Sequence, residues 1–323
     1  MVSKENLKPI LILAGPTATG KSELALELAE ASPEIEIVNA DSLLVYREMD
    51  IGTAKPTPSE LKKVPHHLIN IRNPDELFTA GEFFRAAQSA IQEIHQRNRR
   101  ALIVGGTGFY LKALLFGLWN VPPSDAGIKK ELEKWENEKL SLELKQIDPL
   151  AAQRIGTTDR YRLIRSLELC RLTGKTPTAL QSEHSTSADP RFRLWIVDRA
   201  QDELLKRIQN RTLQMLQSGL IEEVAFLRAR YPKSRALLSV GYAQTCDFLD
   251  QKTPKGRKIS PGIEGLNQEI QLATRQLVKQ QRTWFKSQSA HTAQSRWYEL
   301  DRDLPTLKLE FNLLYREKRV HKI

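Results

Sequence analysis

The sequence predicts an α/β fold in which a doubly wound parallel sheet carries an all-helical insert domain. The runs 10–14 and 101–104 are apolar throughout, which favours strands buried on both faces of a parallel sheet, and 35–40 predicts a further strand. Helical patterns at 22–31 and 86–98 alternate with these strands, and such alternation is typical of doubly wound sheets. A later segment, from 128 to about 182, shows helical patterns only, and this change indicates the insert.

The last third of the chain returns to the predicted sheet. The apolar run 192–197 predicts a further strand, while 202–216 and 221–230 predict helices, the first of which stops at Gly219. A long basic helix is predicted over 268–286. We therefore expect the carboxyl ends of several parallel strands to meet at one edge of the sheet, where open sheets of this kind bind ligands.

The segment between these parts is predicted to form helices only. From 128 to about 182 the chain is rich in Lys, Glu, Leu and Arg, with breaks near 148–149 and 174–175. A polar, turn-prone stretch at 185–190 predicts the linker back to the sheet. The predicted division is a first part of the core at 1–120, a helical insert at 121–189, and a second part of the core with basic C-terminal helices at 190–323.

Composition narrows the class of protein and its partners. Of 323 residues, 40% are hydrophobic, which is enough for a substantial core. Lys and Arg number 49 against 39 for Asp and Glu, and the formal net charge of +10 favours a polyanionic partner such as nucleic acid; an ordinary basic protein is the alternative. The two cysteines, Cys170 and Cys246, make no disulfide framework and no zinc motif. With no signal-peptide pattern and no apolar run near the roughly 20 residues that cross a bilayer, we expect a cytoplasmic protein without membrane association.

The loop after the first predicted strand matches the pattern G-x-x-x-x-G-K-[ST] in full, so the predicted sheet is of the P-loop type. Its glycines let successive backbone N–H groups turn toward phosphate oxygens, and the following helix adds its dipole. Lys21 supplies a mobile cation, and the Ser22 hydroxyl is a candidate ligand for Mg²⁺. Taken alone, the loop favours a nucleoside triphosphate as its ligand. The residues expected to bind phosphate are Gly15, Pro16, Thr17, Ala18, Thr19, Gly20, Lys21 and Ser22.

Polar residues follow the other predicted strands. Asp41 comes directly after 35–40, where a carboxylate would face the phosphate loop and either hold Mg²⁺-bound water or act as a general base; a helix cap is an equally good interpretation. The glycine-rich turn 105–108 is by itself no more than a turn. Arg162 and Arg165 share one helix face because they lie three apart, and a solvated face is the plain interpretation of that pair.

Before any known family is considered, these features indicate a phosphate-binding α/β enzyme. A small-molecule or nucleoside kinase is the generic interpretation. Several motifs taken in order are more specific, because together they resemble the tRNA dimethylallyltransferases, also called tRNA isopentenyltransferases. The match spans roughly residues 10 to 286. The segments that carry it are 15–22, 41–56, 65–69, 104–110, 162–168, 240–242 and 273–277.

The resemblance implies a group transfer instead of a kinase reaction. Members of this family move a dimethylallyl group from dimethylallyl diphosphate to N6 of an adenosine beside the tRNA anticodon, and diphosphate leaves. By resemblance, Asp41 takes the proton of the amino group, Thr17 lies near the reacting end of the donor, and Arg211 lies on the diphosphate side. Mg²⁺ is the implied cofactor, with Ser22 as a ligand. The target base has to leave the anticodon-loop stack to react.

The implied partners are the tRNA anticodon stem-loop and dimethylallyl diphosphate, with the helical insert 121–189 as a tRNA-binding part. We expect the protein to be a monomer. Tyr161 stands where the family usually has Gln, and Leu238 and Ala243 stand where arginines are common. The rival hypotheses are an isopentenyltransferase for free adenine nucleotides, a nucleotide kinase and an RNA-binding protein without activity. The positions that match tRNA contacts are Asp41, Ser42, Leu43, Leu44, Thr107, Lys129, Tyr161, Arg162, Leu163, Ile164 and Arg165.

Overall fold

The computed structural model describes residues 9–118, 121–183, 187–252, 260–292 and 294–316. The chain divides into two compact units: the core, Met1–Leu115 with Ala188–Ile323, and the insert, Phe116–Ser187. The predicted boundary at 119–120 and part of the predicted linker at 185–190 lie outside the described residues. In the described part of the chain, no helix is both long enough and apolar enough to cross a membrane.

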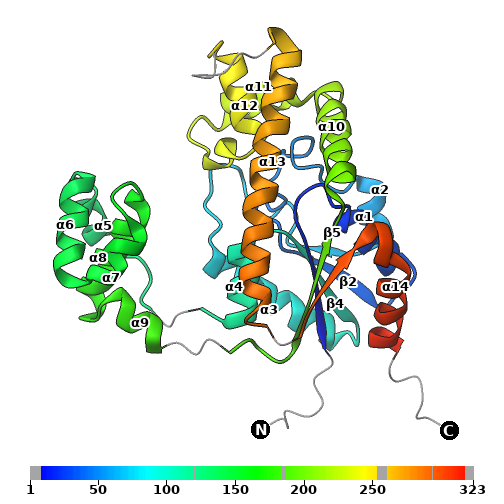
Figure 1. Cartoon of the computed structure of the whole chain (residues 1–323), viewed down its shortest axis with the longest axis horizontal. Coiled ribbons are helices and arrows are strands. Elements are labelled where there is room, and N and C mark those ends of the chain that lie inside the picture. The colour runs from blue at the N-terminus through cyan, green and yellow to red at the C-terminus, as the bar shows by residue number, and fades with distance from the viewer. Residues whose placement is uncertain (1–8, 119–120, 184–186, 253–259, 293, 317–323) are drawn as a thin grey trace. The chain divides into compact units, whose positions relative to one another are not determined.

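A six-stranded parallel sheet forms the centre of the core, with the strand order β3-β2-β4-β1-β5-β6 (Figure 1). β1 lies between β4 and β5, so that Ile12 is opposite Ile103 on one side and Leu194 on the other. Helices connect the successive strands, and the predicted α/β fold class is thereby confirmed. The strands are β1 Ile10–Ala14, β2 Ile35–Asn39, β3 His66–His67, β4 Arg100–Gly105, β5 Phe192–Asp198 and β6 Ser295–Glu299.

The two edge strands escape prediction from the sequence. β3 consists of two half-buried histidines, and β6 carries polar residues such as Arg296 and Glu299, so neither shows an apolar run. Both form because the neighbouring strand offers unpaired backbone groups: Ile37 of β2 is opposite His66, and Trp195 of β5 is opposite Arg296. An edge strand is therefore decided by its neighbour more than by its own apolar pattern.

Helices cover both faces of the sheet. Leu28 of α1 and Phe311 of α14 belong to one apolar cluster with Leu13 and Trp195, which places α1 and α14 on the same face. Figure 1 shows α3 and α4 on the opposite side of the sheet from α14. The helices of the core are α1 Lys21–Glu30, α2 Pro58–Lys63, α3 Ala80–Gln96, α4 Gly108–Phe116, α10 Gln201–Gln217, α11 Leu220–Arg230, α12 Tyr242–Leu249, α13 Gly262–Ser289 and α14 Leu300–Arg316, with a 3₁₀ turn at Arg235–Leu238.

Two helices begin earlier than predicted, and a capping contact explains one of them. α3 begins at Ala80 instead of 86, because Thr79 Oγ1 accepts the N–H of Glu82 (3.2 Å) and the Glu82 carboxylate accepts the N–H of Thr79 (2.8 Å). The long basic helix α13 also begins earlier than predicted, at Gly262. α12 and α14 are not predicted at all. α14 gains its stability from packing on the sheet, which its own sequence pattern does not reveal.

The described residues of the insert contain helices and no strand, and the helices enclose their own apolar centre around Leu144, Leu163 and Leu167. The predicted breaks coincide with helix ends. Asp148 Oδ1 accepts the N–H of Ala151 at the start of α7 (2.9 Å), and Gly174 ends α8 with a φ of 67°. The helices are α5 Ala126–Leu132, α6 Asn137–Ile147, α7 Pro149–Ile155, α8 Arg160–Thr173 and α9 Pro177–Glu183.

Candidate active site

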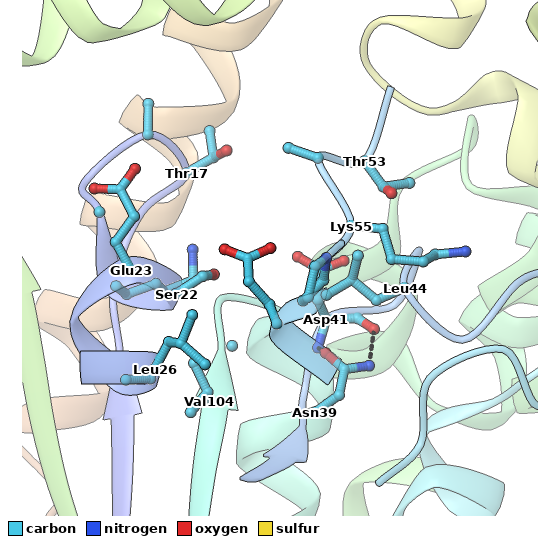
Figure 2. A pocket seen from close by; sticks show the side chains of 18 of the residues that line it. Thr17, Ser22, Glu23, Leu26, Asn39, Asp41, Leu44, Thr53, Lys55 and Val104 are labelled. Carbon is cyan, nitrogen blue, oxygen red and sulfur yellow. Dashed lines mark hydrogen bonds between the residues drawn. The ribbon is translucent and has the colours of Figure 1, made fainter. Parts of the chain in front are cut away.

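A cavity of about 480 Å³ opens at the carboxyl edge of the sheet, within the core. Its walls come from the loops after β1, β2 and β4, from α1 and from α10. Figure 2 shows Thr17 and Ser22 on one side of the cavity and Asp41, Leu44 and Thr53 on the other. The lining residues that the sequence had singled out are Thr17, Ala18, Gly20, Lys21, Ser22, Asp41, Leu44 and Arg211.

The phosphate loop is a tight turn whose conformation is set by residues around it. A Cβ added at Gly15 would lie 2.3 Å from the carbonyl oxygen of Val197, so only glycine fits there. The carbonyl oxygen of Pro16 accepts hydrogen bonds from the Thr19 hydroxyl (3.0 Å) and from the Lys21 ammonium (3.3 Å). Gly20 precedes α1 without a side-chain cap. The first N–H groups of this helix are therefore available to an anion.

Asp41 is held in place by its neighbours at the end of β2. Its N–H donates to Asn39 Oδ1 (2.9 Å), and its Oδ1 accepts the N–H of Leu43 (2.9 Å). Asn39 Nδ2 donates in turn to the carbonyls of Asp41 and Leu68, both at 3.0 Å, and the first of these bonds is visible in Figure 2. No helix begins at Asp41, so the helix-cap interpretation is wrong: one carboxylate oxygen closes a turn, and the side chain lines the cavity.

Thr107 joins the turn after β4 to the turn after β2. Its Oγ1 accepts the N–H of Ser42 (2.9 Å) and lies 3.3 Å from the Ser42 hydroxyl. The glycine-rich turn 105–108 is thus part of the site as well as a turn. A Cβ added at Gly105 would meet the backbone of Ala40 at 2.3 Å, so the two turns touch through their main chains.

Lys21 and Arg211 are the two cations of the cavity whose pKa values respond to the Asp41 carboxylate. Burial lowers the pKa of the Lys21 ammonium to about 8; Asp41 opposes this shift, and Arg211 adds to it. Burial also lowers the pKa of the Arg211 guanidinium, and Asp41 again acts in the opposite direction. Arg211 donates to the carbonyl of Thr53 (3.1 Å) from α10. A dianion placed between Lys21 and Arg211 would relieve their mutual repulsion.

A carboxylate that the sequence reasoning missed holds the wall opposite the phosphate loop. Glu223 of α11 accepts the N–H groups of Asp50 (2.9 Å), Ile51 (2.7 Å) and Gly52 (3.1 Å), together with the hydroxyl of Tyr242 (2.7 Å). These bonds fasten the segment that continues to Thr53 and the other residues of that wall. No local pattern signals this role, because Glu223 looks like an ordinary helix-surface residue.

The wall residue Lys55 makes its own contacts within this segment. Its side chain is 4% exposed, and its ammonium lies 2.6 Å from the Asp50 carboxylate. It also donates to the carbonyl of Tyr46 (2.7 Å) and to Asn70 Oδ1 (2.6 Å). Lys55 therefore stabilises the wall.

Gln281 is a second site residue that escaped prediction as such. From α13, its Oε1 accepts the N–H of Thr17 (2.9 Å), and its Nε2 donates to the carbonyl of Gly106 (3.2 Å). One amide thereby bridges the phosphate loop and the turn after β4. α13 also packs on this turn, because a Cβ added at Gly108 would lie 2.7 Å from the Trp284 ring.

The insert places its predicted tRNA-contacting residues in different environments. Leu163 and Ile164 are buried in the insert's own apolar centre, so their side chains serve packing. Arg165 is engaged within the insert, because it donates to the Glu168 carboxylate (2.5 Å) and to the carbonyl of Pro122 (2.8 Å).

The remaining members of the tRNA-matching set are more open. Tyr161 is 64% exposed, and the exposed Arg162 lies 3.3 Å from the Asp159 carboxylate. Lys129 of α5 is half-buried, with 43% of its side chain exposed. Leu238 and Ala243, which stand where arginines are common in the family, do not belong to this set: Leu238 is 77% exposed in the core, and Ala243 is half-buried in α12.

The parallel sheet and the phosphate loop at its carboxyl edge are typical of α/β proteins that bind a phosphate or diphosphate group there. The family model described as IPP transferase matches residues 44–288. The chain therefore belongs to the IPP transferase family, and the predicted resemblance to the tRNA dimethylallyltransferases is confirmed.

Individual relatives agree with this membership. The tRNA dimethylallyltransferase 1 of Citrifermentans bemidjiense is 41% identical over 291 residues, which cover 88% of this chain and 91% of that protein. The tRNA dimethylallyltransferase of Geobacter sulfurreducens is 41% identical over 288 residues, which cover 87% and 90%. Among solved structures, the tRNA isopentenylpyrophosphate transferase of Bacillus halodurans is 32% identical, with a TM-score of 0.66 and 96% of each chain covered.

A solved structure of lower sequence identity shares the fold. A eukaryotic dimethylallyltransferase acting on tRNA is 22% identical, has a TM-score of 0.81, and matches over 98% of this chain and 81% of that one. At this identity the similarity concerns the fold alone.

Proposed function

We propose that the protein transfers a dimethylallyl group from dimethylallyl diphosphate to N6 of the adenosine beside the anticodon in tRNA, releasing diphosphate. One observation carries the proposal: a single cavity holds the phosphate loop and the cations Lys21 and Arg211 together with the Asp41 carboxylate. A donor that ends in diphosphate and an acceptor that loses a proton would meet there. Membership of the IPP transferase family supports the same assignment.

The donor side accounts for the departure of diphosphate. The free N–H groups at the start of α1 and the charges of Lys21 and Arg211 bind the diphosphate. Negative charge grows on the leaving oxygen as the bond from the allylic carbon to that oxygen breaks. The same cations and N–H groups stabilise this charge, and they are already in position before the reaction.

The acceptor side supplies the base. An adenine amino group is a poor nucleophile, and it improves as its proton is taken away. In the proposed step, the nitrogen forms a bond to the allylic carbon while the carbon–oxygen bond breaks, and the amino proton passes to the Asp41 carboxylate. The N–H of Leu43 keeps that carboxylate in orientation (2.9 Å). Thr17 lines the donor side near the point where the two substrates would meet.

The residues present fit a Mg²⁺ ion that takes most of its ligands from the substrate. Within the described residues, no group of three or more His, Cys, Asp or Glu side chains could hold a metal by itself. The Ser22 hydroxyl lines the cavity beside Lys21 and would be one ligand, with diphosphate oxygens and water completing the shell. When bound, the ion offsets charge on the leaving diphosphate.

Positive surfaces on both units suit an RNA partner. The chain has a formal net charge of +10, and the exposed face of α13 carries Arg275, Lys279 and Lys286. In the insert, Arg162 and the neighbouring Tyr161 are exposed, a pairing that suits phosphate contact and base stacking. We propose that these surfaces bind the anticodon stem-loop, whose target base would then have to unstack at a cost of a few kcal/mol.

A labelling experiment tests the proposal. The protein is incubated with Mg²⁺, labelled dimethylallyl diphosphate and either unmodified tRNA or AMP. We expect label in tRNA at the adenosine beside the anticodon. Label in AMP alone would refute the assignment in favour of a free-nucleotide enzyme. Transfer of phosphate from ATP without any label in RNA would favour a kinase.

Matched variants test the site. Asp41→Asn keeps the size of the side chain and removes the base, so label transfer should fall sharply. Asp202→Asn removes an exposed carboxylate in the first turn of α10 and should leave transfer unchanged. Equal transfer by both variants would contradict the role of Asp41.

We also propose that the active protein is a cytoplasmic monomer. The cytoplasmic location is proposed because the proposed substrate is a cytoplasmic RNA. Light scattering on the purified protein, with and without tRNA, measures the mass directly. A stable dimer of about twice 36.9 kDa would contradict the monomer.

A further inference from the structure

The outer face of the phosphate loop is held by two arginines from outside the loop. Arg207 of α10 donates from Nε to the carbonyl oxygen of Ala18 (2.9 Å). Arg199, which directly follows β5, donates from Nε to the carbonyl oxygen of Thr19 (2.8 Å). Both guanidiniums also lie beside Gly20, since a Cβ there would be 3.2 Å and 3.4 Å from their nearest nitrogens. The motif itself contains neither residue.

These contacts set the direction of the loop's N–H groups. In a trans peptide, the C=O and the following N–H point in opposite directions. With the carbonyls of Ala18 and Thr19 bonded to the arginines, the N–H groups of Thr19 and Gly20 point away from the guanidiniums. Successive N–H groups turned to one side form an anion-binding nest.

The loop needs an external hold because its backbone is strained. Ala18 has a φ of 65° and Gly20 a φ of 90°, and the left-handed region is unfavourable for a residue with a Cβ such as Ala18. A charge-assisted hydrogen bond to the carbonyl of Ala18 compensates for this strain.

The arginines are themselves anchored. Arg207 Nη2 lies 3.0 Å from both carboxylate oxygens of Glu23. Arg199 pairs with Asp301 in the first turn of α14. The Arg199 backbone is fixed as well: its N–H donates to Asp198 Oδ1 (2.8 Å), and its carbonyl accepts from Arg282 Nη2 of α13 (2.9 Å). Arg199 thus links the phosphate loop to the ends of β5, α13 and α14.

We propose that Arg199 and Arg207 are positioning residues that hold the phosphate loop in the form that binds diphosphate. This inference rests on the proposed function, in which the loop binds the diphosphate of the donor. Arg207 also lines the cavity, so it would touch the donor directly as well. Arg199 is absent from the lining of the cavity and acts through Thr19, which makes it the cleaner residue to test.

The competing explanation is simple electrostatic attraction between Arg199 and diphosphate. The Asp301 carboxylate, paired with Arg199, largely cancels that charge at a distance. Arg199→Lys separates the two explanations, because lysine keeps the charge but lacks the fork that reaches Thr19 and Asp301 together. If charge alone acts, Arg199→Lys binds diphosphate like the wild type.

The experiment measures the binding of inorganic diphosphate with Mg²⁺ by titration calorimetry, next to the thermal midpoint and the KM values for dimethylallyl diphosphate and tRNA. In Arg199→Ala we expect the Kd for diphosphate and the donor KM to rise about tenfold, which is about 1.4 kcal/mol. The KM for tRNA should stay within about twofold. Arg199→Lys should show a partial rise, about threefold.

Arg193→Ala serves as the matched control. Arg193 lies on β5, the strand that ends just before Arg199, and donates to the carbonyl of Pro190 (2.8 Å), so its loss should leave diphosphate binding within about twofold. A lower thermal midpoint in Arg199→Ala with an unchanged Kd would overturn the proposal and leave a purely structural role. If Arg199→Ala does not fold, Asp301→Asn releases the same guanidinium, and an unchanged Kd in that variant would also overturn it.

The failure of this inference and the failure of the proposed function look different. If the wild type binds diphosphate but transfers no label to tRNA, the proposed function is wrong while the variants still decide the role of Arg199. If Arg199→Ala binds diphosphate like the wild type while transfer to tRNA is intact, only the positioning role is wrong. A wild type that binds no diphosphate would refute both.

Discussion

Lys21 should make diphosphate binding depend on pH in a range where ordinary lysines do not titrate. Burial lowers the pKa of its ammonium from the ordinary 10.5 to about 8, with Asp41 opposing the shift and Arg211 adding to it. Under the proposed function the Lys21 ammonium is one of the groups that bind diphosphate, so the ligand would favour the charged form of Lys21. Raising the pH through 8 therefore removes a charge from the free protein that the ligand needs.

The size of the effect follows from the position of this pKa. At pH 9, about one-tenth of the free protein carries a charged Lys21, so the apparent Kd for diphosphate should be about tenfold weaker than at pH 7. Because the bound ligand restores the charge, binding at pH 9 should take up close to one proton. The stability of the free protein should move the other way. Between about pH 8 and 10.5 the unfolded chain binds more protons at Lys21 than the folded chain, so this lysine's contribution to the free energy of unfolding rises with pH.

Calorimetry in two buffers with different ionisation enthalpies measures both the affinity and the proton uptake. Lys21→Arg is the matched variant, because its guanidinium stays charged throughout this range. It should bind more weakly than the wild type at pH 7 but with a flat profile up to pH 9. A constant Kd for the wild type from pH 7 to 9, or release of a proton on binding, would refute the reasoning about Lys21.

Three further predictions concern the walls of the cavity and the base. Glu223→Ala removes the acceptor of four hydrogen bonds and should lower the free energy of unfolding by about 3 kcal/mol, against about 1 kcal/mol for Tyr242→Phe, which removes one; denaturant titration that finds the two equal would contradict this. Asp41→Asn should lower kcat about 10²-fold to 10⁴-fold and leave the Kd for tRNA within about threefold, so that a collapse of tRNA binding would exclude it as the base. Gly15→Ala places a Cβ 2.3 Å from the Val197 carbonyl and should cost about 2 kcal/mol or more, visible as a lower thermal midpoint; a midpoint like that of the wild type would show that the loop can move aside.

Local patterns were sufficient for the central sheet and the phosphate loop. The strand at 10–14 and the loop 15–22 could be located because a buried parallel strand is apolar along its whole length, and because few turns other than a phosphate loop combine those glycines with Lys21 and Ser22. Asp41 could be placed near the loop for a similar reason: parallel strands present their carboxyl ends at one edge.

Edge elements and helix ends were harder, because their stability comes from partners. β6 pairs with β5 despite polar residues, and α14 packs on the sheet through Phe311. The start of α3 depends on the capping pair Thr79 and Glu82, a signal that is present in the sequence but weaker than apolar spacing.

The sequence alone thus determined the phosphate loop, the turns that follow the central strands, and the family. Each of these depends on residues close together in the chain or on motifs in a fixed order. What surrounds the loop was decided only by the tertiary structure. Arg199 reaches Thr19, Gln281 reaches Thr17 and Glu223 reaches the Asp50 turn across more than 150 residues of chain. The physical reason is that hydrogen bonds between distant segments leave no periodicity in either one, so only the folded chain shows which carbonyls and N–H groups they hold.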